Sequence, residues 1–589
     1  MSQQQTYMIP TSTKEMNALG WEQADIILIS GDAYVDHPAF GVAVLARMLQ
    51  QYGYKVAVIP QPNWKDDLRD FKKLGKPRLF FGVSAGNMDS MVNHYTANRR
   101  LRSDDAYTPG GKAGFRPDYA TSVYAEILKS IFPDSPVIIG GIEASMRRFT
   151  HYDYWQDKLI KGIMADTEAD MLICGMSEYP LVKIAEAMHN GAGISDLTDI
   201  PQTQILLEKL PEEVDTIQLN DHQECMKSAR AFADNFVAIE RNANSLEAGV
   251  IAQPVDGKWL FTNPPEKLLS AKKLDKIYDL PYTRIPHPRY KGKGDIPAYQ
   301  MIRHSVNIHR GCFGGCAFCT IAAHQGKWVQ SRSVKSVTKE INKIIEMPDY
   351  KGYISDLGGP SANMYGMKPV DMNICRKCKR PSCIDPIICK NLNTDHKPMT
   401  ELYKRVRKNP KIKQVTIGSG IRYDLIFNAP EKYQAQAHEY FRELVKYHVA
   451  GRLKVAPEHT ERKVLKWMRK PDFHLFEEMY DLFHKINREE GKNQQLIPYF
   501  ISGHPGCDLQ DMDKLVRQTK DLNLLTEQVQ DFTPTPMTLA TVMYYTGIHP
   551  YTGEKVHVPK GQEKLEQRKI LSRDNKSRGK DFSGKRKKK

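Results

Sequence analysis

Three cysteines stand close together near the middle of the chain, in a loop rich in glycine. Cys312, Cys316 and Cys319 have the spacing C-x3-C-x2-C and follow a short apolar run. Thiolates are soft ligands that suit zinc, copper(I) and iron–sulfur centres. A [4Fe–4S] cluster usually takes four protein thiolates, so three would leave one iron open to a substrate or cofactor. The spacing predicts such a cluster, and a three-ligand zinc site or free thiols are the alternatives.

Four further cysteines lie in a basic, proline-containing stretch, residues 371–392. Cys375, Cys378, Cys383 and Cys389 have the spacing C-x2-C-x4-C-x5-C. Four thiols so close in sequence can complete the ligand shell of a metal centre. We predict a second metal site, either an auxiliary [4Fe–4S] cluster or structural zinc, with a disulfide-linked knuckle as the alternative.

The elements around both cysteine sets alternate between strands and helices. The run 305–308 predicts a strand that leads directly into the three-cysteine loop. Helices fit between it and the further predicted strands, which cover residues 352–356, 414–417, 453–455, 495–501 and 527–532. This order predicts a partial, open (β/α)6 barrel over residues 298–550. Functional residues of such barrels gather at the carboxyl ends of the strands, where the three-cysteine loop lies.

The first 200 residues show a similar alternation. Short apolar strands are predicted at residues 24–30, 55–59, 78–84, 136–142 and 170–174, with amphipathic helices between them. The pattern predicts a Rossmann-like domain over residues 1–200, with a doubly wound parallel sheet that binds ligands at the carboxyl ends of its strands. The candidate residues at those ends are Asp32, Asp36, His37, Ser84, Gly86, Asn87, Glu143, Arg147 and Arg148.

Residues 201–297 have a weaker pattern and are predicted to form a connecting α/β region and linker. Helices are expected over residues 204–210 and 221–242. A hairpin is expected over residues 253–262, because Asp256-Gly257 is a favoured two-residue turn. The last part of the region is rich in Pro, Gly and Lys, which is typical of a connection between domains.

The formal net charge of +16 is concentrated at the end of the chain. Residues 560–589 contain 13 Lys or Arg and 4 Asp or Glu, with little apolar content. We predict a basic, disordered tail over residues 551–589. Such a tail either holds RNA or the ribosome by counterion release or only keeps the protein soluble.

The cysteine content indicates the compartment. Ten cysteines among 589 residues are too few for a disulfide scaffold, and seven of them belong to the two sets above. Metal binding by thiols implies a reducing, cytoplasmic environment. No apolar run is long enough for a membrane span and the start lacks a signal peptide, so no membrane partner is expected.

The run from His309 to Ser333 and the upstream run Gly140-Gly141-Ile142-Glu143-Ala144-Ser145 resemble the YgiQ-type radical S-adenosylmethionine (SAM) proteins. The similarity spans residues 7–550 and includes the α/β domain that precedes the radical SAM core in that family. The family is bacterial and has no assigned reaction. The resemblance implies a [4Fe–4S] cluster on the three-cysteine loop, with SAM on the open iron. An electron from a flavodoxin- or ferredoxin-like donor would cleave SAM, and the resulting 5′-deoxyadenosyl radical would remove hydrogen from a substrate.

The resemblance also implies a SAM site at the rim of the barrel. Gly358 and Gly359 occupy the place of a Gly-Gly-Glu element that binds the SAM amino group, but no Glu follows here. Their backbone carbonyls would then accept the ammonium. Ser419 and Arg422 follow the third strand, and the Arg422 guanidinium can pair with the SAM carboxylate or a substrate anion. Glu458 after the fourth strand can accept from ribose hydroxyls.

The sequence leaves alternative functions open. The N-terminal region also resembles cobalamin-binding domains, which would make the protein a cobalamin-dependent radical SAM methyltransferase. The adjacent residues Asp36 and His37 depart from the D-x-H-x-x-G pattern that supplies a cobalt ligand, so cobalamin is not the main expectation. His459 beside Glu458 is a candidate acid or base near neutral pH. A protein that binds iron–sulfur or nucleic acid without cleaving SAM is the non-enzymatic alternative.

Overall fold

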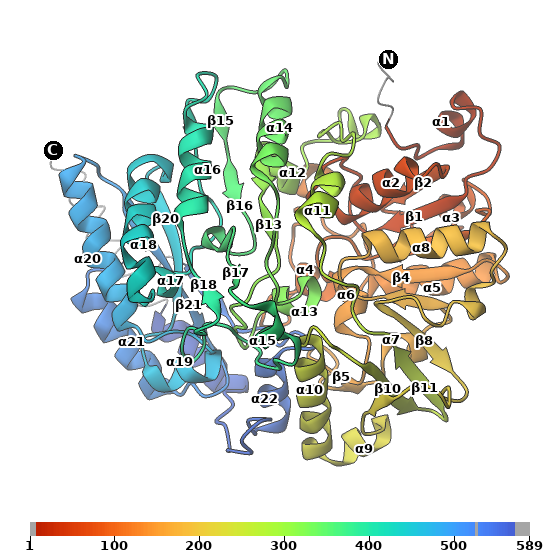
Figure 1. Cartoon of the computed structure of the whole chain (residues 1–589). Coiled ribbons are helices and arrows are strands. Elements are labelled where there is room, and N and C mark those ends of the chain that lie inside the picture. The colour runs from red at the N-terminus through yellow and green to blue at the C-terminus, as the bar shows by residue number, and fades with distance from the viewer. Residues whose placement is uncertain (1–7, 525–527, 572–589) are drawn as a thin grey trace. The chain divides into compact units, whose positions relative to one another are not determined.

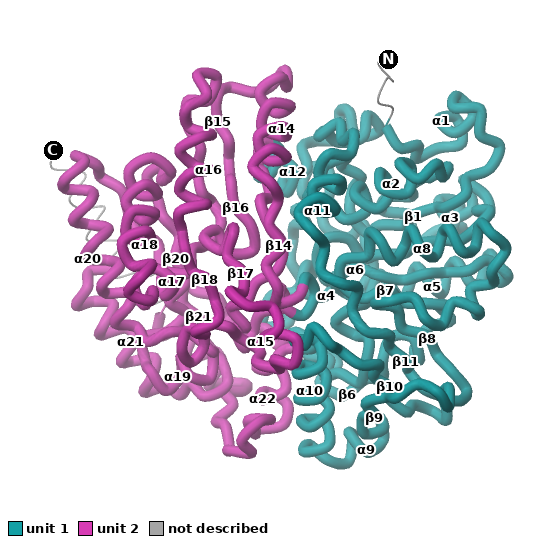
Figure 2. Tube along the Cα trace, viewed as in Figure 1, with its two compact units in different colours: residues 1–303, 323–325, 535–537 teal, residues 304–322, 326–534, 538–589 magenta. Residues whose placement is uncertain are grey.

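The computed structural model describes residues 8–524 and 528–571. The chain divides into two compact units (Figure 2). The N-terminal unit holds residues 1–303 with the short segments 323–325 and 535–537, and the barrel unit holds the remainder from residue 304 onward. The boundary at Arg303 lies close to the predicted start of the barrel at residue 298.

The N-terminal unit is built on a nine-stranded sheet of order β2-β1-β3-β4-β7-β8-β11-β10-β9. The first five of these strands are parallel: β2 Val56–Pro60, β1 Ile26–Ser30, β3 Phe80–Ser84, β4 Val137–Gly140 and β7 Met171–Ile173. Alternate residues of β1 belong to two different apolar cores, Ile26 and Leu28 to one and Ile27 and Ile29 to the other. Both faces of the sheet are therefore buried, as the near-continuous apolar strands predict.

Helices cover both faces of this sheet (Figure 1). Helices α2 Gly41–Gln51 and α8 Glu178–His189 contribute to the first core, and α5 Ala120–Ile131 contributes to the second. The predicted doubly wound, Rossmann-like arrangement is thereby confirmed.

Strands within residues 203–262 belong to the same sheet, so this part is not a separate connecting region. Strands β8 Thr203–Leu207, β11 Lys258–Thr262, β10 Val250–Val255 and β9 Thr216–Gln218 extend it beyond β7. The predicted helix over residues 204–210 is wrong, because β8 is hydrogen-bonded antiparallel to β7 and β11. The second predicted helix is present as α9 His222–Lys227 and α10 Ala229–Ala243. The hairpin is confirmed, with positive φ at Asp256 (50°) and Gly257 (77°).

The barrel unit has the predicted alternation, in short strands. They are β12 Ser305–Asn307, β15 Tyr353–Ile354, β16 Asp356–Gly358, β19 Gln414–Val415, β20 Arg452–Glu458, β21 Gln495–Ser502 and β22 Gln528–Asp531. Parallel pairs join β12 to β16, β15 to β19, β20 to β21 and β21 to β22. Between them lie α14 Val334–Ile345, α16 Lys397–Arg407, α18 Glu431–Glu443, α19 Arg462–Met468, α20 His474–Glu489 and α21 Leu509–Asp521.

Helix α14 illustrates how the local sequence determines where an element begins and which face it buries. Ser333 caps it by accepting a hydrogen bond from the Ser336 amide, which satisfies one free donor of the first turn. Val337, Ile341 and Ile344 recur on one face and are buried. The helix therefore starts where the cysteine loop ends and holds its apolar face against the barrel.

Part of the predicted tail is folded. Residues 561–571 form a helix, and its Gln567 side chain accepts from the Gly503 amide (2.8 Å) and donates to the Cys507 carbonyl (2.9 Å). Buried Lys564 donates to the Phe532 carbonyl at 2.8 Å. The prediction of disorder from residue 551 is wrong for this segment, because polar side chains anchor it to the ends of β21 and β22. Residues 572–589 lie outside the described residues.

We expect Gln567→Ala to lower the free energy of unfolding of the barrel unit by about 2–6 kcal/mol. The change leaves two buried backbone groups without a partner, each costing about 1–3 kcal/mol. Gln562→Ala is the matched control, because Gln562 is exposed on the same helix. Denaturant unfolding of both variants measures the difference, and equal stabilities would mean that the helix is not anchored as described.

Candidate functional site

The three-cysteine loop is closed at its base by a two-residue ladder. Strand β13 His309–Arg310 pairs antiparallel with β14 Gln330–Ser331, so the chain enters and leaves the loop side by side. The Cys312 amide donates to the Gly326 carbonyl at 3.2 Å. Gly311 has φ +79°, and a Cβ there would lie 2.1 Å from the Trp328 carbonyl oxygen. The glycine is therefore required for the turn into the loop.

A buried arginine lies against the cysteines. The Arg422 guanidinium donates from Nη1 to the Cys316 sulfur at 3.2 Å and forms a bidentate pair with Asp424 (2.9 and 2.5 Å). Burial raises the pKa of Cys312 to about 11 and that of Cys319 to about 12. The loop thus holds three half-buried thiols, with a fixed positive charge beside Cys316.

Asn363 fixes the Arg422 backbone and was not predicted to matter. Its side-chain Oδ1 accepts from the Arg422 amide at 2.7 Å, and its Nδ2 donates to the Arg422 carbonyl at 2.9 Å. Asn363 is fully buried. The only sequence signal for it was its position in the polar segment that follows the second barrel strand.

The predicted Gly-Gly element faces a histidine. A Cβ at Gly359 would lie 2.5 Å from Cε1 of His309, and a Cβ at Gly358 would lie 2.5 Å from Oγ of Ser419. His309 is buried, and neither of its ring nitrogens has a hydrogen-bond partner among the residues that the structure describes. Burial lowers the pKa of His309 to about 3, so the ring is neutral. Ser419 itself donates to Asp356 at 2.5 Å.

Glu458 ends β20 in an unusual conformation. Its φ is +69°, at a point where the pairing of β20 with β21 shifts register. The carboxylate is buried 3.5 Å from the Lys470 ammonium, and burial raises its pKa. A non-glycine residue at positive φ costs about 1–3 kcal/mol and is typical of functional sites. The structure therefore brings Glu458 into the dry region near Cys319, whose pKa it raises further after the effect of burial.

His459 does not have the properties expected of an acid or base. Its side chain is fully buried, and burial lowers its pKa to about 3. The ring instead caps Glu461, whose amide donates to Nδ1 at 3.0 Å. The His459 ring is therefore neutral near pH 7 and caps the following turn.

The four-cysteine segment folds back on itself. The Cys378 amide donates to the Cys375 carbonyl (3.1 Å), and the Cys389 amide donates to the Cys383 carbonyl (2.8 Å). Burial raises the pKa of Cys383 to about 11, with Lys327 lowering it and the other three cysteines raising it. The other three cysteines are therefore close enough to influence the Cys383 thiol. All ten cysteines are free thiols in the structure. The second metal site and the disulfide-linked knuckle both stay predictions.

The two cysteine sets lie against each other. The Cys383 amide donates to the carbonyl of Phe313, the neighbour of Cys312, at 3.0 Å. A Cβ at Gly315 would lie 2.6 Å from the Pro381 carbonyl oxygen. Cys312, Cys383 and Cys389 also flank one small apolar core around Phe313. Sequence reasoning did not foresee this contact, because it joins segments that are far apart in the chain.

Both cysteine sets offer thiols, which are ligands of zinc and of iron–sulfur clusters alike. Among residues 8–524 and 528–571, no three Cys, His, Asp or Glu side chains converge as the ligands of one metal ion do. Ligands of one zinc ion all lie at 2.0–2.3 Å from a single point. The thiolates of a [4Fe–4S] cluster bind separate irons and stand farther apart. The metal held by each cysteine set therefore stays a prediction.

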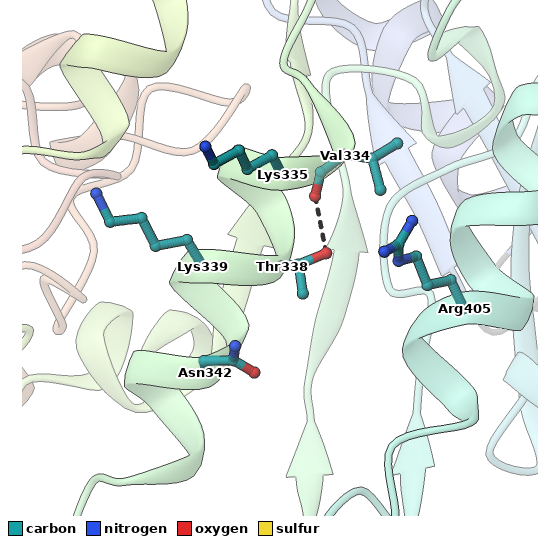
Figure 3. A pocket seen from close by; sticks show the side chains of 6 residues that line it. All are labelled: Val334, Lys335, Thr338, Lys339, Asn342 and Arg405. Carbon is teal, nitrogen blue, oxygen red and sulfur yellow. Dashed lines mark hydrogen bonds between the residues drawn. The ribbon is translucent and has the colours of Figure 1, made fainter.

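A pocket elsewhere in the barrel unit belongs to neither set. It has a volume of about 510 Å³ and lies between α14 and α16 (Figure 3). Its lining residues are Val334, Lys335, Thr338, Lys339, Asn342 and Arg405. None of them is a cysteine or a residue of the predicted SAM site, so the pocket is separate from the candidate centre.

The polar rim of the N-terminal sheet is paired within the protein. Arg116 is fully buried between Asp32 (2.8 Å) and Asp105 (3.1 Å), and Asp36 pairs with Arg47. Elsewhere on the rim, Asp89 pairs with Arg147, and Glu143 accepts from the backbone of Ser90 and Thr121. The predicted residues do gather at the strand ends, and the protein itself supplies their partners. The cobalamin alternative stays a prediction.

Comparison with known families agrees with this architecture. The family model described as Radical SAM N-terminal matches residues 8–305, and the Radical SAM superfamily model matches residues 306–519. A domain of unknown function, DUF3362, matches residues 527–576 and so includes the anchored C-terminal helix. A barrel with a three-cysteine loop at its rim, matched by the Radical SAM model, defines a radical SAM enzyme that uses a [4Fe–4S] cluster and SAM.

The relatives identify the family within that class. A UPF0313 protein of Porphyromonas gingivalis is 58% identical over 95% of this chain and 89% of its own length. Another, from Bacteroides thetaiotaomicron, is 56% identical over 96% of this chain and 94% of its own length. The chain belongs to the UPF0313 family.

Solved structures show a more distant likeness. The radical SAM methyltransferase TsrM from Kitasatospora setae, with cobalamin and a [4Fe–4S] cluster bound, is 15% identical with a TM-score of 0.47. The match covers 88% of this chain and 77% of TsrM.

Within the described ranges, no helix has the length and apolar character that a membrane crossing requires.

We expect Gly359→Ala to raise the KM for SAM about tenfold, because the added methyl group overlaps the His309 ring and overpacking costs about 1–3 kcal/mol. Gly420→Ala is the matched control, since a Cβ there has no atom within 4 Å. SAM cleavage measured against SAM concentration compares the two variants. An unchanged KM for Gly359→Ala would place the SAM site elsewhere.

Proposed function

We propose that Cys312, Cys316 and Cys319 hold the [4Fe–4S] cluster and that the rim residues beside them position SAM. The observation that carries the proposal is the Arg422 guanidinium, which is locked by Asp424 and touches the Cys316 sulfur. When bound, the cluster and SAM supply a 5′-deoxyadenosyl radical for hydrogen removal. The substrate of that radical is the unknown part of the reaction.

The residues around the loop then have distinct roles. Arg422 offers a positive charge to the SAM carboxylate, and the carbonyls of Gly358 and Gly359 accept from its ammonium. The unpaired ring nitrogens of His309 supply a further polar contact at the same place. Glu458 is held by Lys470 and accepts from the ribose hydroxyls. Burial of these groups excludes water, which strengthens each polar contact.

An anaerobic assay tests the proposal. The reconstituted full chain is incubated with SAM and dithionite, and 5′-deoxyadenosine and methionine are measured. Formation of both products in the presence of a bound iron cluster supports the proposal. A protein that carries a complete cluster and binds SAM, yet yields neither product with or without cell extract as a source of substrate, would contradict it.

We infer a polyanionic substrate, RNA or ribosome, in a bacterial cytoplasm. The inference is supported by the net charge of +16, by free cysteines suited to a reducing compartment, and by bacterial relatives. A flavodoxin- or ferredoxin-like protein is the proposed source of electrons. A small-molecule substrate is the second candidate, favoured by the ligand-binding type of sheet in the N-terminal unit.

A truncation after Leu571 distinguishes the two substrates. It removes nine Lys or Arg and two Asp but keeps the anchored helix. If RNA is the substrate, affinity should fall at least about tenfold at low salt and its dependence on salt should become shallower, because fewer phosphates are neutralised. RNA binding measured over a salt series gives both quantities. Unchanged binding and slope would contradict a role for residues 572–589 in substrate capture.

A further inference from the structure

An unusual surface surrounds the second cysteine set. Residues 368–390 carry six Lys or Arg against two Asp. Large apolar side chains are exposed on the same segment: Val370 64%, Met372 43%, Ile374 63% and Ile387 64%. Exposed basic side chains lie on the same segment at Lys368, Arg376, Lys377, Lys379 and Lys390. We call these nine residues the cysteine-segment surface.

Exposed apolar side chains within a basic rim are typical of a docking site for another protein. A contiguous apolar patch usually marks an interaction surface, and a basic rim attracts an acidic partner and speeds its encounter. Two of the four cysteines form hydrogen bonds with the fold behind this surface. Asn391 donates to the Cys375 sulfur at 3.3 Å, and Cys383 donates to the Phe313 carbonyl at 3.0 Å. Cys383 therefore joins this segment directly to the first loop.

The path from this surface to the first loop is short. Cys383 and Cys312 are separated by one hydrogen bond and the backbone of Phe313. Ser382 donates to the same carbonyl at 3.3 Å, and Lys327 of the first loop donates to the Arg380 carbonyl at 2.8 Å. Such close packing suits transfer of an electron between the two centres.

We propose that the cysteine-segment surface docks an acidic one-electron donor protein and that Cys375, Cys378, Cys383 and Cys389 hold a cluster that relays its electron to the three-cysteine loop. The step moves one electron: the donor is oxidised by one electron, the centre on the first loop is reduced by one, and no bond or proton changes. The inference rests on the proposed function, since the first loop must hold the accepting cluster.

Charge reversal tests the docking surface. The full reconstituted chain carrying Lys377→Glu and Lys379→Glu is mixed anaerobically with a reduced bacterial flavodoxin, and cluster reduction is followed by absorbance. We expect the reduction rate to fall at least about tenfold at low salt. The control carries Lys408→Glu and Lys432→Glu, two exposed lysines outside this segment. It should reduce at the wild-type rate. Equal rates for both double variants would overturn the docking site.

Metal analysis tests the relay. Wild-type protein should contain about eight irons per chain, and Cys375→Ser with Cys378→Ser should retain about four, because each cluster holds four irons. That variant should still be reduced by dithionite at the first loop and should lose rapid reduction by flavodoxin. Zinc at the second set, or flavodoxin reduction that is unchanged after the iron is lost, would overturn the relay.

Dithionite and flavodoxin experiments distinguish failure of the proposed function from failure of the docking inference. If wild-type protein with dithionite cleaves no SAM, with or without cell extract as a source of substrate, the proposed function fails. If it does cleave SAM, but flavodoxin reduces the charge-reversed and wild-type chains equally, only the docking inference fails. Dithionite is small and needs no docking surface, so it separates the two outcomes.

Discussion

Cys312→Ala is expected to abolish SAM cleavage and to remove about half of the iron from the reconstituted chain, since each cluster holds four irons. A [4Fe–4S] cluster that binds SAM has three protein ligands, so losing one leaves too few thiolates to hold it. Arg422, which lies beside Cys316, cannot replace the lost thiolate, because a guanidinium does not bind a metal. Iron and sulfide quantitation, with 5′-deoxyadenosine formation, measures the result.

Two control variants make this result specific. Cys225→Ala removes a buried thiol outside both sets, so iron content and SAM cleavage should both remain. Cys378→Ala removes a thiol of the second set, so SAM cleavage with dithionite should remain while iron falls. Wild-type SAM cleavage by Cys312→Ala would mean that the three-cysteine loop does not carry the chemistry.

The cysteine loop and the order of strands and helices were predictable because both are local in sequence. Spacing places three thiols in one loop, and apolar periodicity sets each element. The prediction of a helix over residues 204–210 is wrong because it too used only local sequence. The short apolar run at Ile205 suits either a helix or a strand, and hydrogen bonds from β7 and β11 decide between them.

The partners of the site residues depend on contacts between distant segments. Nothing near Glu458 indicates that Lys470 will neutralise it, and nothing near Cys312 indicates that Cys383 will pack against it. Composition misled at the C-terminal end, since a basic segment was expected to stay in water. Lys564 and Gln567 are buried there because backbone groups of the barrel rim need their hydrogen bonds. His459 was misjudged because burial, which sequence does not show, sets its pKa.

Arg422→Met is expected to lower the reduction potential of the first cluster by about 60 mV, which corresponds to about a tenfold change for a one-electron couple. Reduction adds a negative charge to the cluster, and the guanidinium 3.2 Å from the Cys316 sulfur stabilises that charge. Asp424 forms the other half of the buried pair. Asp424→Asn removes a negative charge and should therefore raise the potential.

The pair of variants separates an electrostatic role from a structural one. Each breaks a buried ion pair and should destabilise the barrel unit by about 3–5 kcal/mol, so stability moves in the same direction in both. The potential moves in opposite directions only if these charges act on the cluster. The double variant Arg422→Met with Asp424→Leu should recover stability, because a buried pair replaced by apolar side chains is often neutral. Its potential should stay below that of the wild type, since the guanidinium, which contacts the sulfur directly, is the nearer of the two charges. A shift of the same sign in both single variants would show that Arg422 only supports the fold.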